Sequence, residues 1–252
     1  MMDSALLLVA AFFAGTLNAV AGGGSFLTLP ALIAVGVPSV TANATGTVAL
    51  LPGYVASIAG SREDMEPAPG LSMPLVIGLS LVGGVLGAAL LLVTSEAAFN
   101  RLIPWLLLAA TAMFAFGPQL RRWADGHRAG SAQASRAKAV AGLLLVAGYG
   151  GYFNGGMGIL MLALFGLLGQ TKLNAMNAIK NLVSTLLTAI AVAIYAVGGI
   201  VQWKEALIMM VAATLGGYLG ARGARKLPPA VLRWSIVVIG LVMTVLFFIK
   251  LR

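Results

Sequence analysis

The chain has no cysteine and only one histidine, His127, among its 252 residues. The lack of cysteine excludes disulfides and thiol chemistry, and a lone histidine argues against a histidine-based metal site. Acidic side chains are also scarce: there are seven, and each lies near the end of an apolar segment or in a loop. Without a buried base or nucleophile, we expect no enzymatic activity and no cofactor.

Charge of either sign is rare as well. Charged residues make up 9% of the chain and hydrophobic residues 60%, whereas a soluble domain has about 25% charged residues. Apolar runs of about 20 residues, long enough to cross a bilayer, recur along the sequence. The net charge of +9 does not indicate a nucleic-acid partner, because the cations lie in loops and follow the positive-inside bias. The composition predicts an all-α integral membrane protein.

An internal repeat organises the chain. The motif Gly83-Gly84-Val85-Leu86-Gly87-Ala88 returns at positions 216–221, and Asn43-Ala44 returns as Asn177-Ala178. Repeats in a membrane protein are typical of transporters, with the substrate site between the repeats. Each copy is expected to be a glycine-broken helical hairpin followed by three transmembrane helices. The predicted first repeat, 1–120, has a hairpin at 3–37 and helices at 39–60, 70–94 and 97–119; a basic loop follows at 121–137, and the second repeat, 138–252, has a hairpin at 138–168 and helices at 172–199, 203–221 and 228–250.

The cations predict how the chain is inserted. Five of them fall between positions 121 and 138, so this loop is expected in the cytoplasm. Three spans after each hairpin is an odd number, so the second repeat should be inverted relative to the first and both termini should lie outside the inner (plasma) membrane. Segment 3–20 is long enough to span by itself, so full crossing and re-entry both stay open. The N-terminus carries Asp3 and no early cation, so a cleaved signal peptide is not expected.

The hairpin tips are the first candidate site. Their sequences are Gly22-Gly23-Gly24-Ser25 and Asn154-Gly155-Gly156-Met157-Gly158. Glycine reaches positive φ without steric cost, and the helix that begins after such a break presents an N-terminus that attracts anions. Close helix packing is the alternative interpretation of these glycines. For Gly83, Gly87, Gly216 and Gly220 we prefer packing.

A polar stripe on segment 172–199 is the second candidate. It carries Asn174, Asn177, Lys180, Asn181, Ser184 and Thr188, and steps of three and four place most of these on one stripe. Lys180 lies roughly 12 Å inside the segment at 1.5 Å per residue, where a lysine usually marks a functional site; snorkelling to the interface is the alternative. One cation in an otherwise duplicated polar cavity suits a small anion. The expected substrate-binding residues are Asn18, Gly22, Gly23, Gly24, Ser25, Asn43, Thr47, Asn154, Gly155, Gly156, Gly158, Asn177, Lys180 and Asn181.

Several of these motifs resemble a known family. The stretch from Gly15 to Phe26, Asn43-Ala44-Thr45, Tyr149-Gly150-Gly151-Tyr152-Phe153 and Gly216 to Ala221 are similar, in order, to the TauE/SafE sulfite exporter family. The resemblance implies an inner-membrane permease for sulfite, sulfonates or related sulfur-containing anions. It also implies that the glycine-rich tips take part in binding.

The leading hypothesis is export of a small sulfur-containing anion, such as sulfite or sulfoacetate. Uptake of a sulfonate or another small organic anion is the alternative within transport. A membrane-embedded enzyme and a structural membrane subunit are the alternatives outside it. The expected partners are the anionic substrate and the lipid bilayer, and a homodimer is compatible with the sequence. The direction of transport, the coupling ion and the oligomeric state stay open.

Overall fold

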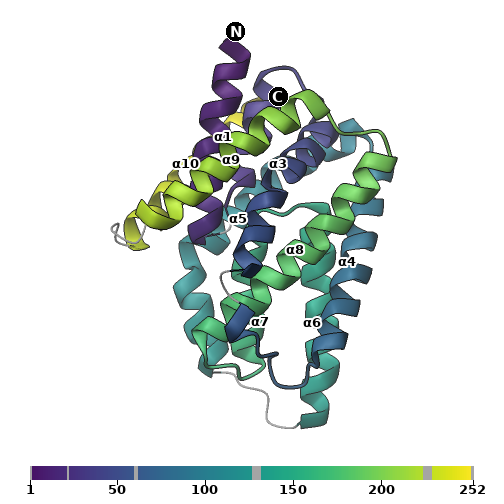
Figure 1. Cartoon of the computed structure of the whole chain (residues 1–252), viewed down its shortest axis with the longest axis vertical. Helices are drawn as coiled ribbons and strands as arrows, with labels where there is room; N and C mark the ends of the chain where they lie inside the picture. The colour runs from purple at the N-terminus through teal and green to yellow at the C-terminus, as the bar shows by residue number, and fades with distance from the viewer. Residues whose placement is uncertain (1, 22, 60–61, 127–131, 224–228, 251–252) are drawn as a thin grey trace.

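The protein is described from a computed structural model that covers residues 2–21, 23–59, 62–126, 132–223 and 229–250 (Figure 1). These residues form helices and connecting turns, with no strand among them. The helices are α1 (Met2–Ala21), α2 (Ser25–Ala34), α3 (Ser39–Ala59), the 3-10 turn η1 (Arg62–Asp64), α4 (Met73–Val93), α5 (Glu96–Gly126), α6 (Ala132–Tyr152), α7 (Met157–Leu167), α8 (Leu173–Val197), α9 (Trp203–Gly223) and α10 (Pro229–Lys250).

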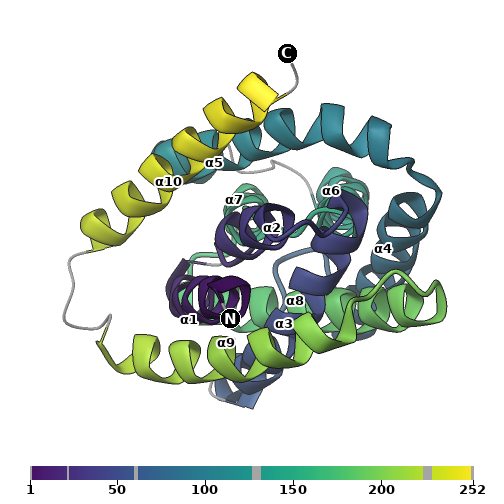
Figure 2. The same cartoon turned by 90° about the horizontal axis from the view of Figure 1, so that it is seen from above.

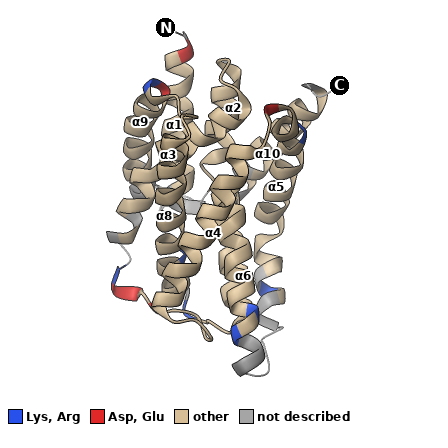
Figure 3. Cartoon of the chain, turned by 90° about the vertical axis from the view of Figure 1, so that its right-hand side faces the viewer, with Lys and Arg blue, Asp and Glu red and all other residues tan. Residues whose placement is uncertain are grey.

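The outer surface has the character expected of a membrane protein. Many large apolar side chains are exposed along the long helices, Leu86 and Val211 among them. Within the described residues, three helical stretches are long and apolar enough to cross a membrane: Met73–Val93, Glu96–Leu120 and Asn174–Val197. Charged residues gather toward the two ends of the long axis (Figure 3). An all-helical, apolar-surfaced protein of this kind agrees with the predicted class.

The helices break at the glycine-rich tips. In the first half, α1 ends at Ala21 and α2 begins at Ser25; in the second half, α6 ends at Tyr152 and α7 begins at Met157. The helices after the breaks are short, with 10 residues in α2 and 11 in α7. Seen from above, both lie inside the ring of long helices (Figure 2), and they occupy opposite halves of the long axis (Figures 1 and 3).

Two expected boundaries differ from the structure. The basic loop predicted at 121–137 is largely helical, because α5 continues to Gly126 and α6 already begins at Ala132. Residues 127–131 lie outside the described part of the chain. Arginine, glutamine and alanine favour helix, so these helices extend past their apolar segments. As a result α6 has 21 residues, longer than the short segment expected at 138–153.

The two halves pack with the same pattern of partners. Helix α1 lies against α9, and its counterpart α6 lies against α4. Helix α3 contacts α9 as α8 contacts α4, and α5 pairs with α10. The first helix of each broken pair is therefore held by the other half of the chain.

Small residues allow these helix pairs to approach closely. A Cβ added to Gly216 of α9 would lie 1.9 Å from the carbonyl oxygen of Phe12, and one added to Gly87 of α4 would lie 2.1 Å from that of Gly148. Thr16 Oγ1 also donates to the carbonyl of Gly216 at 2.9 Å. A Cβ on Gly83 would likewise lie 2.9 Å from the backbone nitrogen of Gly148. Gly83, Gly87 and Gly216 thus serve helix packing, as predicted. The surroundings of Gly220 lie outside the description.

Candidate functional site

The second tip has the backbone geometry that its glycines predict. Gly156 adopts φ +76°, in the left-handed region, directly before α7. The Tyr149 hydroxyl donates to the carbonyl of Gly155 at 2.6 Å and ties the tip to α6. Asn154, Gly155, Gly156 and Gly158 are all buried. Only glycine occupies the Gly156 conformation at low cost, so this residue sets the turn.

The first tip is built differently. Gly24 has φ −57° and ψ −36°, so the expected positive φ is wrong at this residue. Its small size is needed instead, because a Cβ there would lie 2.9 Å from Leu50 Cδ1 and 3.0 Å from the carbonyl oxygen of Ala14. Gly23 and Ser25 are buried, whereas Gly22 lies outside the described residues.

The start of α2 offers fewer free amides than expected. The backbone N–H groups of Phe26 and Leu27 donate to the carbonyls of Gly23 and Gly24 at 3.1 Å each. A helix N-terminus attracts anions mainly through N–H groups without an internal partner. The tight first turn of α2 therefore weakens the anion-binding role predicted for this N-terminus.

The broken end of α6 is capped by side chains from other helices. Asn43 Nδ2 of α3 donates to the carbonyl of Tyr152 at 2.9 Å, and the Tyr195 hydroxyl of α8 donates to that of Gly151 at 2.6 Å. The last carbonyls of a helix lack intrahelical partners, and a membrane interior supplies no water to replace them. The structure thus gives Asn43, expected to bind substrate, a capping contact. Thr47 is buried and its hydroxyl donates to the carbonyl of Asn43 at 2.8 Å.

Four polar side chains from both halves meet at the tips; we call them the central polar cluster. They are Asn18 near the end of α1, Tyr54 of α3, Asn154 at the second tip and Thr188 of α8. The Tyr54 hydroxyl lies near the side chains of Asn18 and Asn154, and Asn154 Nδ2 donates to Thr188 Oγ1 at 3.4 Å. The cluster thus brings the end of α1 and the second tip together with the long helices α3 and α8.

Two side-chain oxygen atoms of the central polar cluster have no hydrogen-bond partner within the protein. The side-chain oxygens Asn18 Oδ1 and Asn154 Oδ1 are buried and have no hydrogen-bond partner. An unpaired buried acceptor costs roughly 1–3 kcal/mol, so a ligand that pairs with it gains that energy. The amide ends can exchange by rotation, because the hydroxyls of Tyr54 and Thr188 both donate and accept. The two asparagines can therefore offer either acceptors or donors to a ligand.

Sequence reasoning missed Tyr54 altogether and left Thr188 out of the expected site. A signal was available: Tyr54 follows Asn43 by the same eleven positions that separate Thr188 from Asn177. The two residues are thus equivalent in the repeat. A search for polar side chains at equivalent positions of the two halves would have identified both residues.

Lys180 lies beside the second tip but apart from the central polar cluster. Its Cδ would be 3.3 Å from a Cβ added to Gly158, and its side chain is partly buried. It precedes Thr188 by eight residues of α8, or about 12 Å along the helix. Among the described residues, no carboxylate forms an ion pair with Lys180. Asn177 and Asn181 are partly buried, and neither is without a partner.

A polar pocket of about 630 Å³ opens where η1 meets the start of α8. It is lined by Glu63, Asp64 and Glu66 together with Lys172, whose Nζ lies 2.6 Å from Glu66 Oε2. Both partners of this ion pair are more than half exposed, so it contributes little to stability. No residue of the central polar cluster lines this pocket.

Comparisons with known proteins found a family model and relatives that match nearly the whole chain. The family model described as "Sulfite exporter TauE/SafE" matches residues 7–247. A "Probable membrane transporter protein" of Haemophilus influenzae is 30% identical over 95% of this chain and 92% of its own length. "Probable membrane transporter protein ORF9" of Sinorhizobium is 26% identical, and "Probable membrane transporter protein YfcA" of Escherichia coli is 27% identical; each alignment covers 96% of this chain and 90% of the relative. No solved structure gave a significant match.

Proposed function

The chain belongs to the sulfite exporter TauE/SafE family, and from this premise we propose that it exports a small sulfur-containing anion through a site between two inverted repeats. Sulfite and organosulfonates such as sulfoacetate are the proposed substrates. The family and the names of the relatives indicate a membrane transporter and not an enzyme.

The packing pattern supports the inverted repeat. The contacts of the first five helices recur among the last five: α1 packs against α9, and its counterpart α6 packs against α4, the counterpart of α9. Both chain termini lie at one end of the long axis (Figures 1 and 3). The cations of the α5–α6 region, including exposed Arg122 and Arg136, favour the cytoplasm. We propose that the termini face outward across the inner membrane.

The observation that carries the proposed site is the pair of unpartnered amide edges in the central polar cluster. Asn18 lies on the first broken helix and Asn154 at the second tip, and the Tyr54 hydroxyl lies near both. An anion bound between them would accept hydrogen bonds from amide nitrogens or hydroxyls. The same ligand would then sense both halves of the molecule, which alternating access requires.

Lys180 has a different role in this proposal. Because it lies about 12 Å from Thr188 along α8, we propose that it attracts the anion on the inner side instead of contacting it at the centre. Its counterpart Gly46 cannot do so, since a Cβ there would already lie 2.7 Å from Thr28 Oγ1. The positive charge is thus present on one side only.

Export of an anion needs no proton-carrying carboxylate in the membrane interior. Asp3, Glu63, Asp64 and Glu66 are exposed, and moving one negative charge outward across 100 mV, inside negative, gains about 2.3 kcal/mol. We therefore propose uniport that follows the membrane potential.

The test is a flux assay in proteoliposomes with sulfite, sulfate, sulfoacetate, taurine and lactate at a controlled potential. We expect outward flux of sulfite or sulfoacetate that grows with inside-negative potential. Accumulation against that potential would favour the alternative, an uptake permease. No flux of any of these anions would refute the proposed substrate class.

A variant pair tests the site separately. Tyr54→Phe removes the hydroxyl between the two amides, and we expect substrate affinity to fall roughly tenfold, the effect of losing about one buried hydrogen bond. Tyr218→Phe on α9, where the side chain is 54% exposed, is the matched control and should keep wild-type affinity. Equal affinity in both variants would make the central polar cluster a packing element.

A further inference from the structure

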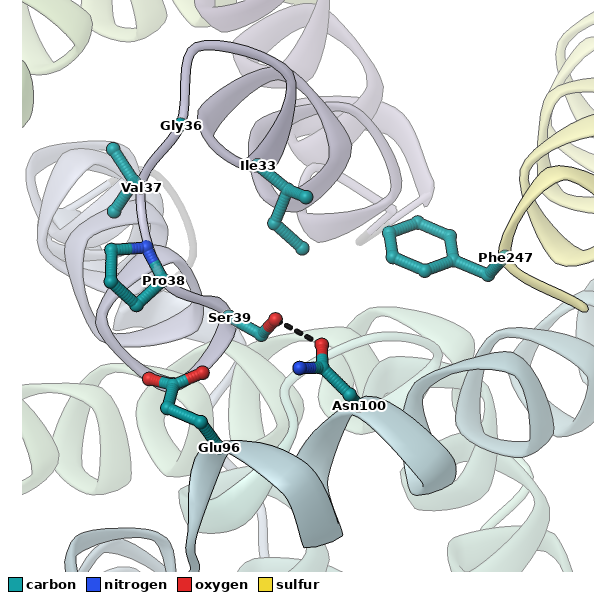
Figure 4. A pocket seen from close by; sticks show the side chains of 8 residues that line it. All are labelled: Ile33, Gly36, Val37, Pro38, Ser39, Glu96, Asn100 and Phe247. Atoms are coloured by element: carbon teal, nitrogen blue, oxygen red, sulfur yellow. Dashed lines mark hydrogen bonds between the residues drawn. The ribbon is translucent and has the colours of Figure 1, made fainter. Parts of the chain in front are cut away.

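Two adjoining pockets lie between α2 and the neighbouring helices. The first, of about 420 Å³, is lined by Ser39, Glu96 and Asn100 on one side and by Ile33 and Phe247 on the other (Figure 4). The second, of about 360 Å³, is lined by apolar side chains of α1, α2 and α10 and shares Ile33 and Phe247 with the first. We call the pair the amphipathic cleft, because one end is polar and the other is apolar.

The polar end carries an acidic group. Among the described residues that line it, Glu96 is the one ionisable side chain. Both of its carboxylate oxygens lie 3.1 Å from the backbone nitrogen of Val40 and cap the start of α3. A carboxylate has about four lone-pair sites, so Glu96 can accept further hydrogen bonds from a ligand. This end therefore favours a cationic group and disfavours an anionic one.

Asn100 adds a donor beside this charge. Its Oδ1 accepts a hydrogen bond from the Ser39 hydroxyl, so its amide nitrogen is the atom turned toward the side of Glu96 (Figure 4). A carboxylate and an amide N–H₂ next to each other match a ligand that carries an amine and a phosphate. Free anions do not fit this combination, because Glu96 repels them.

The apolar end fits a hydrocarbon chain. Its lining includes Leu6 and Ala10 of α1, Leu27 of α2 and Met243 of α10. Both volumes fall in the range of about 300–1,000 Å³ that ligand sites occupy. In a membrane protein, acyl chains surround such a groove and fill it when a headgroup anchors them.

We propose that the amphipathic cleft binds one phospholipid whose headgroup carries a primary amine, of the phosphatidylethanolamine type. The ammonium pairs with Glu96, the phosphate accepts from the Asn100 amide, and one acyl chain lies in the apolar groove between α2 and α10. The bound lipid then braces α2, the short helix that follows the first tip. The inference depends on the membrane location of the protein and is independent of the transported anion.

Native mass spectrometry of the delipidated full chain in detergent tests the proposal. Phosphatidylethanolamine, phosphatidylcholine and phosphatidylglycerol with identical acyl chains are titrated separately. We expect one molecule of phosphatidylethanolamine to bind tightest and phosphatidylglycerol weakest. Glu96→Gln keeps an acceptor for Val40 but removes the charge, and it should lower phosphatidylethanolamine affinity about tenfold or more. Glu205→Gln, which alters a carboxylate that lines neither pocket, should change nothing.

A second variant separates the headgroup from the chain. Ala34→Trp fills the groove from an exposed position of α2 and should weaken all three lipids alike without changing their order. Phosphatidylglycerol that binds wild-type protein as tightly as phosphatidylethanolamine would overturn the proposal, and this comparison needs no variant to fold. Unchanged headgroup preference in folded Glu96→Gln, or tighter binding of a long-chain alkyl sulfonate, would overturn it as well.

Discussion

Replacing Gly87 by alanine should separate α4 from the end of α6. The added Cβ would lie 2.1 Å from the carbonyl oxygen of Gly148 and 2.6 Å from the backbone nitrogen of Tyr152. Real Cβ atoms essentially never approach closer than 3.0 Å, so the two backbones must move apart by about 0.9 Å. These neighbours are backbone atoms of a packed helix, and no side chain can rotate away to relieve the contact.

The size of the effect follows from this geometry. Overpacking a tight interface costs typically 1–3 kcal/mol, occasionally more, and backbone-on-backbone contact belongs at the upper end. A loss of about 3 kcal/mol lowers the Tm of a chain of this size by roughly 6–12 °C. Because the contact lies where α6 ends, the second tip shifts as well, and we expect anion flux to fall with stability.

Gly78→Ala is the matched control on the same helix. Nothing lies within 4 Å of a Cβ at Gly78, and alanine favours helix over glycine by roughly 0.5–1 kcal/mol. The control should therefore be as stable as wild type or slightly more stable. Thermal unfolding in detergent and flux in proteoliposomes are measured for both variants. A Gly87→Ala protein that matches Gly78→Ala in Tm and flux would refute the close-packing argument.

Three further predictions concern the topology, the tip and the lysine. The cysteine-free chain allows single-cysteine labelling: Ala137→Cys should react only from the cytoplasm and a C-terminal cysteine only from outside, and cytoplasmic labelling of the C-terminus would contradict the inverted repeat. Gly156→Ala carries both an unfavourable φ and a Cβ 3.0 Å from Met113 Cε, so it should lose more flux than Gly169→Ala, which has φ +89° and open space; equal losses would exclude a special role for the tip. Lys180→Gln should weaken anion affinity by about tenfold and Lys180→Arg less, with Lys204→Gln as the surface control, and wild-type affinity in Lys180→Gln would show that the lysine snorkels.

The glycine-rich tips illustrate what a sequence can predict and where it fails. Local sequence located both helix breaks, because glycines placed between two apolar helices are poor helix formers. It did not distinguish their geometry: Gly156 needs positive φ, whereas Gly24 is right-handed and needs only space beside Leu50. The backbone conformation of a tip depends on which helices surround it, and those helices are distant in the sequence.

The repeat and the apolar composition were determined by the sequence alone, because bilayer length and helix packing act on local residues. The roles of the polar residues were decided by tertiary structure. Asn43 caps the end of α6, while Asn18 and Asn154 keep unpaired oxygens around Tyr54. In a membrane interior each polar atom must find a partner in the protein, and the partner comes from whichever helix lies alongside. The sequence shows which polar atoms need hydrogen-bond partners. Only the packing of the helices determines which of these atoms remain available to a ligand.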